Sequence, residues 1–163
     1  MRVTDKRTEF DWNGELADMI RDIDPGAVRI FQRTPEGGYS REIQRVYSEV
    51  DAWGADCSIE LHFNGGPASA TGCETLSSGT SGSLALADLV QRYTLDAMPM
   101  RDRGVKTIGR DQRGGQSLWA GRAPAVMTEP YFGSNARDCH IADDHMSMLA
   151  EATYVAAREF CAQ

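Results

Sequence analysis

The sequence predicts an α/β fold, a three-layer sandwich with a mostly parallel central sheet flanked by helices. Short apolar segments typical of strands alternate along the chain with segments whose apolar residues recur at helical spacing. Such alternation favours strands that are connected through helices packed on the sheet. At 163 residues the chain has the length of one domain, and no internal repeat or linker divides it. We therefore expect residues 1–163 to form a single domain.

The elements are predicted from these two periodicities and from the glycine and proline residues that end them. Helices are expected at 10–23, 40–52, 83–98 and 142–160. Strands are expected at 27–33, 56–63, 72–76 and 123–129. The stretch SSGTSGS reads as a flexible loop before the third helix. Residues 99–122 read as a long surface loop with one short strand.

The charge and composition of the chain exclude several classes of function. The chain has 24 acidic and 17 basic residues and a formal charge of −7, which gives no electrostatic reason to bind nucleic acid or an anionic membrane. No apolar run approaches the ~20 residues of a membrane-spanning helix. The N-terminus, MRVTDKRTEF, lacks the apolar segment of a signal peptide, so we expect synthesis in the cytoplasm. The four cysteines form no CxxC pair and read as reduced thiols: Cys57, Cys73, Cys139 and Cys161.

The segment SIELHFNGG ends a predicted strand on a histidine. Alternation places Ile59, Leu61 and Phe63 on one face of the strand, with Glu60 and His62 on the other. His62 then lies at the carboxyl end of the strand, which is where open α/β sheets bind ligands. Taken alone, His62 is either a buried structural histidine or one member of a reactive site.

Two carboxylates are candidate companions. In AVMTEP, Glu129 ends an apolar strand, and Pro130 prevents the ladder from continuing. In TEFDWNGE, Glu9 precedes the first helix, where exposed N–H groups favour a carboxylate. Glu15 is a rival to Glu9, but it falls inside the helix and is expected to face solvent. The structural alternative for each carboxylate is a helix cap or a first-turn acid.

Several familiar motifs are excluded. GTSGS is not a nucleophile elbow because Ser83 replaces the final glycine, and the chain has no phosphate-binding loop and no H-E-x-x-H pair. DCHIADDH is rich in metal-ligand types, but His140 and His145 are five residues apart and would diverge on a helix. We expect this segment to start a helix, with Asp143 and Asp144 near its N-terminus.

A family resemblance emerges from these segments taken together. IELHFNGG, GCETL and APAVMTEPYFGSNARD, in this order, resemble the zinc-dependent N-acetylmuramoyl-L-alanine amidases of the amidase type 3 family. TEFDWNGELADMI resembles the first-helix region of the family's phage endolysin branch. The resemblance extends from about Thr8 to the C-terminal helix.

The resemblance implies a peptidoglycan hydrolase that cleaves the amide between N-acetylmuramic acid and the L-alanine of the stem peptide. By position, Glu9 and His62 match zinc ligands, and Glu129 matches the catalytic glutamate. Glu60 shares a strand face with His62 and is a candidate to hold its imidazole. A catalytic zinc commonly takes three protein ligands and activates water, with a nearby carboxylate moving the proton.

The chain departs from the family pattern before Glu9. Family members begin with a strand and a G-H element whose histidine is the first zinc ligand, and neither has a counterpart here. We therefore expect an N-terminally shortened amidase domain with two zinc ligands.

Two alternatives stay open. One is a non-catalytic peptidoglycan-binding or scaffold protein that has lost its metal, and the other is an α/β hydrolase of another amide. The expected partner is peptidoglycan, reached after release from the cytoplasm, with Arg110 and Arg113 of the 99–122 loop contacting it.

Overall fold

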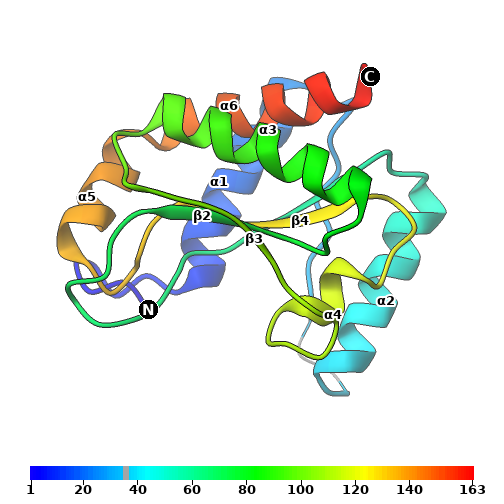
Figure 1. Ribbon diagram of the computed structural model, residues 1–163, viewed down its shortest axis with the longest axis horizontal. Coiled ribbons are helices and arrows are strands. Elements are labelled where there is room, and N and C mark those ends of the chain that lie inside the picture. Colours follow the sequence, from blue (N-terminus) through cyan, green and yellow to red (C-terminus); the bar gives the residue numbers. More distant parts are fainter. Residues whose placement is uncertain (35–36) are drawn as a thin grey trace.

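A computed structural model describes residues 1–34 and 37–163 and places a four-stranded sheet between helices (Figure 1). The helices are α1 (Glu9–Ile23), α2 (Tyr39–Trp53), α3 (Ser81–Ala97), α4 (Gly115–Leu118), α5 (Ala136–Asp144) and α6 (Met146–Cys161). The strands are β1 (Ser58–Leu61), β2 (Cys73–Ser77), β3 (Asp102–Thr107) and β4 (Ala125–Glu129).

The strands lie in the order β1-β4-β2-β3. β1 pairs with β4 in parallel, β2 pairs with β3 in parallel, and the central β4–β2 pair is antiparallel. The carboxyl ends of β1 and β4 therefore lie at the same end of the sheet as the start of β2. This mixed but mostly parallel sheet confirms the predicted fold class.

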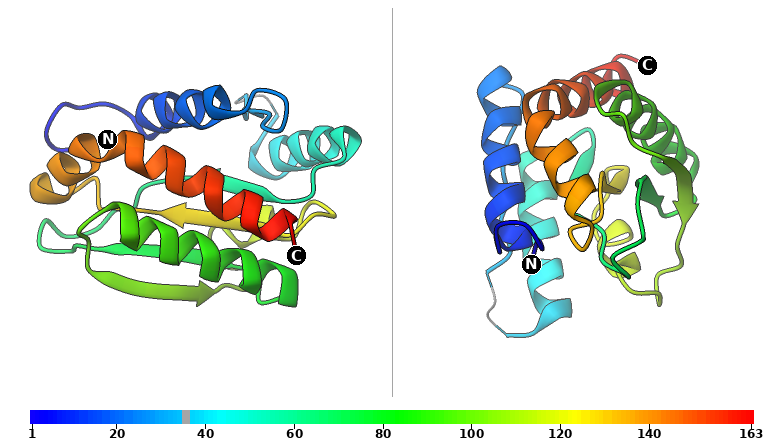
Figure 2. Two further views of the ribbon diagram at one scale, coloured as in Figure 1. Left: turned by 90° about the horizontal axis from the view of Figure 1, so that it is seen from above. Right: turned by 90° about the vertical axis from the view of Figure 1, so that its left-hand side faces the viewer.

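Side-chain alternation along β4 divides the core between two helical layers. Val126 points to the face covered by α3 and α6, where it packs with Leu86 and Ala156. Met127 points to the opposite face and packs with Tyr47 of α2 and Leu118 of α4. In Figure 2, α6 lies between α1 and α3, in agreement with its contacts to both helices. Along the described residues, no helix has both the length and the apolarity to span a membrane.

Helix α1 confirms the prediction for 10–23. Thr8 caps its N-terminus: the Thr8 hydroxyl accepts a hydrogen bond from the Asp11 amide (3.1 Å), and the Asp11 carboxylate accepts one from the Thr8 amide (3.0 Å). One face of the helix is buried through Trp12, Leu16 and Ile20, which recur at helical spacing. The predicted helix at 40–52 and the strands at 56–63, 72–76 and 123–129 are also found, with boundaries shifted by at most two residues.

The predicted strand at 27–33 is wrong. Its residues form no element of the sheet, and no strand among the described residues pairs with them. Their side chains pack instead: Val28 joins the core around α1, and the Phe31 ring lies 6.1 Å from that of Trp53. β-Propensity depends strongly on packing context, and this segment packs against helices and adds no strand beside the edge strand β1.

The stretch expected to be a flexible loop, SSGTSGS, is an ordered helix start. The Thr80 hydroxyl caps α3 by accepting a hydrogen bond from the Ser83 amide. The buried Ser83 hydroxyl donates to the Ala125 carbonyl oxygen at 2.7 Å, which ties α3 to β4. Residues 99–122 likewise contain more structure than one short strand, because α4 follows β3 within them.

The expectation that DCHIADDH starts a helix is also wrong. Asn135 caps α5, so this segment forms the body and C-terminal end of that helix, and α6 begins after His145. Asp143 is thus far from a helix N-terminus and accepts hydrogen bonds from Arg2, Arg7 and the Trp12 indole. These long-range partners stabilise its charge.

Arg2 anchors the N-terminal segment. Its side chain is fully buried and lies 5.7 and 5.6 Å from the ring centroids of Trp12 and Tyr131. Its Nη2 atom donates to an Asp143 carboxylate oxygen (2.6 Å) and to the Cys139 carbonyl oxygen (2.9 Å). One side chain therefore connects the first residues to α1 and α5.

We expect Arg2→Leu to lower the free energy of unfolding by about 1–3 kcal/mol, because it removes the buried charge-assisted hydrogen bonds to Asp143 and to the Cys139 carbonyl oxygen. Arg7 and the Trp12 indole still contact Asp143, so its charge keeps partners. Chemical denaturation measures this change.

Arg21→Leu is the matched control, since among the described residues Arg21 forms ion pairs with Asp18 and Asp22 on the exposed side of α1. It should leave the midpoint near that of the wild type. Equal effects of the two substitutions would contradict the anchoring role of Arg2.

Candidate active site

Acidic and histidine side chains form a row across one end of the sheet. His62 directly follows β1, and its amide donates to the Thr128 carbonyl oxygen (3.1 Å). It stands one residue beyond the paired positions Leu61 and Thr128, which places it beside Glu129. Across the antiparallel pair, Glu129 is in register with Glu74 of β2. The strand pairing thus assembles residues that are far apart in the sequence.

Glu9 extends this row beyond the β1 edge. The start of α1 presents its carboxylate to the end of β1, where Oε1 lies 2.8 Å from His62 Nδ1 and 3.0 Å from the Phe63 amide nitrogen. Burial acts to raise the pKa of Glu9, but the hydrogen bond and charge of His62 hold it below its usual range. Glu9 is therefore ionised and fixes the first helix against the strand.

Glu60 holds the opposite side of the imidazole. Its Oε2 lies 3.3 Å from His62 Nε2 and accepts a hydrogen bond from the Ser117 hydroxyl (3.0 Å), and its Oε1 accepts one from the Tyr47 hydroxyl (3.0 Å). Burial opposes ionisation of Glu60, yet these contacts, led by that with His62, lower its pKa. The carboxylate is thereby oriented by both α2 and α4.

His62 lies between two carboxylates. Burial disfavours the charged ring, but the contacts with Glu60 and Glu9 outweigh that cost and raise the pKa of His62 to about 9. Because both carboxylates are ionised, each ring nitrogen has to donate a proton to satisfy the two contacts. In this arrangement the ring is an imidazolium whose orientation is determined from both sides.

Glu129 is the carboxyl group of the row that titrates near neutrality. Burial, reinforced by the negative charge of the neighbouring Glu74, raises the pKa of Glu129 to about 7. Glu74 itself accepts hydrogen bonds from Arg103 Nε (2.8 Å) and from the Asn64 side-chain amide. Glu129 can therefore hold or release a proton near neutral pH, which is the property of a general acid–base.

Sequence reasoning identified Glu9, Glu60, His62 and Glu129 but missed Glu74. A carboxylate inside an apolar strand is rarely buried without a partner, and Glu74 is 9% exposed, so its position within GCETL was the available signal. The remaining partners of the site, Tyr47, Ser117 and Arg103, come from elements that only the fold brings near the row.

The other sequence candidates lie outside the row. Glu15 is exposed on α1 and pairs with Arg7 (2.9 Å). His145 Nδ1 contacts the Ile141 carbonyl oxygen (2.9 Å) between α5 and α6, and His140 is exposed on α5. These placements agree with the expectation that the two histidines do not act together.

Glu9 and His62 match zinc in ligand type, since a carboxylate oxygen and an imidazole nitrogen are both common zinc ligands. They fall short in number, because a catalytic zinc takes three protein ligands. Within residues 1–34 and 37–163, no group of three or more His, Cys, Asp or Glu side chains is arranged to hold a metal ion. The pair alone therefore offers a weak metal site.

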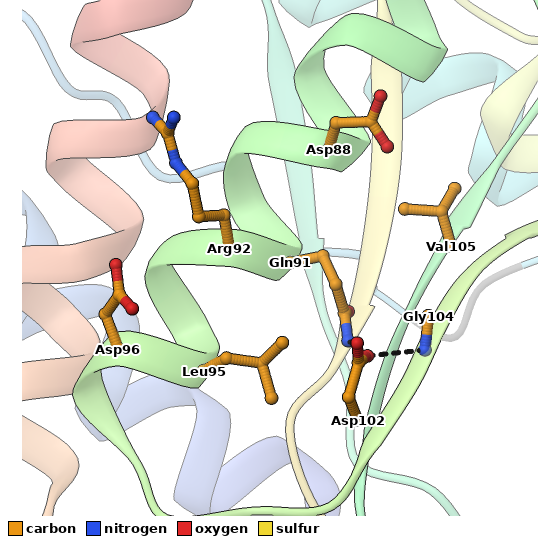
Figure 3. A pocket seen from close by; sticks show the side chains of 8 residues that line it. All are labelled: Asp88, Gln91, Arg92, Leu95, Asp96, Asp102, Gly104 and Val105. Atoms are coloured by element: carbon orange, nitrogen blue, oxygen red, sulfur yellow. Dashed lines mark hydrogen bonds between the residues drawn. The ribbon is translucent and has the colours of Figure 1, made fainter.

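A separate acidic hollow of about 370 Å³ lies between α3 and β3 (Figure 3). Asp102 accepts hydrogen bonds there from Gln91 and from the Gly104 amide, both at 2.7 Å, and Arg92 pairs with Glu159. Asp102 and Arg92 are thus engaged within the fold, whereas Asp88 and Asp96 form no ion pair among the described residues, and none of the predicted site residues lines the hollow.

The fold is an α/β sandwich with a row of carboxyl and imidazole groups at the carboxyl ends of two parallel strands. The family profile described as N-acetylmuramoyl-L-alanine amidase (amidase type 3) matches residues 3–158. The chain belongs to this family, which confirms the resemblance found in its motifs.

Solved amidase structures have the same fold. The catalytic domain of CwlV, an N-acetylmuramoyl-L-alanine amidase from Bacillus (Paenibacillus) polymyxa var. colistinus, is 19% identical with a TM-score of 0.82, over 99% of this chain and 89% of that one. An N-acetylmuramoyl-L-alanine amidase from Clostridium difficile 630 is 22% identical with a TM-score of 0.79, and the match covers 99% of this chain and 88% of that one. The catalytic domain of the CD27L endolysin, which targets Clostridia difficile, is 22% identical with a TM-score of 0.75. This match covers 93% of this chain and 83% of that one. No curated protein sequence matches the chain.

We expect Glu129→Gln to raise thermal stability in a pH-dependent way. The folded chain holds the Glu129 proton up to a pKa of about 7, above the ordinary value of 4.5, so ionising this group costs stability as the pH rises through that interval. Glutamine has no proton to lose. The gain in Tm should therefore be small at acidic pH, grow through the interval and stay constant above it.

Thermal unfolding at a series of pH values measures this gain. Glu151→Gln, at an exposed position of α6, removes the same charge as a control and should show no such trend. A gain from Glu129→Gln that is the same at every pH would contradict the raised pKa.

Proposed function

We propose that this chain hydrolyses the amide bond between N-acetylmuramic acid and the L-alanine of the peptidoglycan stem peptide. Its membership of the N-acetylmuramoyl-L-alanine amidase family supports this reaction. The observation that carries the proposal is the position of Glu129, with its pKa of about 7, directly beside His62 at the end of the sheet. We further propose that the chain acts on the cell wall after release from the cytoplasm.

Glu129 is the proposed proton carrier of the reaction. Amide hydrolysis requires that an attacking water lose a proton and that the departing amine gain one. A carboxyl group with a pKa near 7 performs both transfers at neutral pH, accepting the proton and then donating it to the nitrogen. Glu74, held by Arg103 and Asn64, maintains this property because its charge disfavours ionisation of Glu129.

We propose zinc as the cofactor, with Glu9 and His62 supplying the protein ligands. Zinc bound at this end of the sheet would polarise the scissile carbonyl and lower the pKa of water. Glu60 would hold the imidazole through the ring nitrogen that Glu9 does not contact, as carboxylate partners of histidine ligands commonly do. Two ligands imply weak retention of the metal.

We expect Glu129→Gln to reduce peptidoglycan hydrolysis by roughly two to four orders of magnitude, the contribution typical of a general acid–base. The assay measures new amino termini of L-alanine released from purified peptidoglycan. Glu151→Gln should keep wild-type activity, and circular dichroism verifies that both variants are folded.

Full activity of Glu129→Gln would refute the proposed role of Glu129. Binding of peptidoglycan by the wild type without any cleavage would instead support the non-catalytic alternative. Release of amines from another amide but not from peptidoglycan would support a different hydrolase.

The zinc content of the purified protein after dialysis against zinc is expected to be below one ion per chain, because two ligands bind weakly. His62→Ala should lower it further, whereas His140→Ala, at an exposed position of α5, should leave it unchanged. Elemental analysis measures all three proteins. A full equivalent of zinc that His62→Ala abolishes would reveal a third ligand, and no zinc in any protein would refute the proposed cofactor.

A further inference from the structure

A hollow of about 710 Å³ lies between the N-terminal half of α2, the loop that precedes α4, and α4 itself. Figure 1 shows α4 and this loop beside α2, on the opposite side of the sheet from α3 and α6. Its volume is in the range that binds a small ligand or a short segment of a polymer. Aromatic, amide and arginine side chains line it, among them Tyr39, Gln44, Arg110, Arg113, Gln116 and Trp119.

The hollow adjoins the candidate active site through α4. Gln116 lines the hollow, and the next residue, Ser117, donates its hydroxyl hydrogen bond to Glu60. Gly114 also lines the hollow, and a Cβ atom at this position would lie 3.4 Å from Cε of Met127, two residues before Glu129. The hollow therefore adjoins the acidic row through the buried residues of α4, although none of the row's own residues lines it.

The loop that carries the arginines is held in a definite shape. Gly115 begins α4 so close to the loop that a Cβ atom there would collide with the Gly109 carbonyl oxygen. The Gln112 amide donates to that same oxygen (3.0 Å), and the Gly109 amide donates to the Gln112 side-chain oxygen (2.6 Å). The ordered loop presents its side chains without a large cost of ordering on binding.

The two arginines of the hollow have no carboxylate partner among the described residues. Arg113 takes part in no ion pair there, and Arg110 donates only to the neutral Trp119 carbonyl oxygen (3.2 Å). Asp111 is the acid among the lining residues, so the hollow is locally basic. Guanidinium groups in this state favour a carboxylate ligand.

Two aromatic rings complete the lining. Tyr39 is 49% exposed and Trp119 is 38% exposed, which leaves large ring surfaces accessible. Exposed aromatic side chains that flank cationic groups provide apolar contact area and hydrogen-bonding atoms at a binding site. The combination fits a ligand with both carboxylates and apolar groups, and a bare uncharged glycan would leave the arginines unpaired.

We propose that this hollow is the subsite that receives the carboxylate-bearing stem peptide of peptidoglycan. Arg110 and Arg113 bind its carboxylates, and the rings of Tyr39 and Trp119 contact its apolar groups. The amide to be cleaved then extends past α4 to Glu129 and His62. This assignment rests on the proposed function, because that function is what makes the stem peptide the substrate.

The test measures binding of a free stem peptide, which contains no bond for the enzyme to cleave, to the full chain by calorimetry. The double variant Arg110→Ala/Arg113→Ala is expected to weaken binding at least about tenfold, the effect of losing charge-assisted hydrogen bonds. Trp119→Ala should weaken it several-fold while the backbone carbonyl that Arg110 contacts stays in place. The matched control, Arg101→Ala/Arg158→Ala, removes the same charge at exposed positions outside the hollow and should bind as the wild type does.

Two results would overturn the proposal. One is an affinity for the stem peptide that is unaffected by the loss of Arg110 and Arg113, or too weak to detect with the wild type. The other is tighter binding of a chitin oligosaccharide than of the peptide, which would assign the hollow to the glycan. Cleavage assays distinguish failure of the proposed function from failure of the proposed subsite. Binding of the stem peptide without cleavage of peptidoglycan refutes the proposed function alone. Cleavage that does not depend on Arg110 and Arg113 refutes the subsite alone.

Discussion

The pairing of β4 on both of its edges determines the arrangement of everything else in this protein. β4 lies between β1 and β2, and its first four residues are buried. Its alternating side chains contact the α3–α6 layer through Val126 and the α2–α4 layer through Met127. Because a shift of one residue would exchange these faces, the register is strongly specified. The same register places Glu129 beside His62 and opposite Glu74.

The row brings several acidic groups together at one end of the sheet. A cation lies between Glu9 and Glu60, and Glu74 is stabilised by Arg103. Among the described residues, Glu129 is the member of the row without a cationic partner in direct contact. Its ionised form is therefore less stabilised than those of Glu9, Glu60 and Glu74. The same burial that stabilises the core thus produces a carboxyl group that exchanges its proton near neutral pH.

Strand alternation correctly placed Glu60 and His62 on one face, because a period of two is a property of any extended chain. The contacts of that face were not predictable, because Tyr47 and Ser117 belong to α2 and α4. The segment 27–33 illustrates the same limit. Its composition is typical of a strand, but whether such a segment joins the sheet depends on how it packs in the whole fold.

The sequence by itself determined the fold class, most of the element positions, the family, and four members of the row: Glu9, Glu60, His62 and Glu129. These follow from local periodicity and from motifs, which are readable within short windows. Only the tertiary structure decided that Glu74 faces Glu129, that Arg2 is buried against α5, and that Arg110 and Arg113 line a hollow beside the site. Distances and burial between residues that are remote in the sequence depend on strand register and layer packing, and they also determine the pKa of each acidic group.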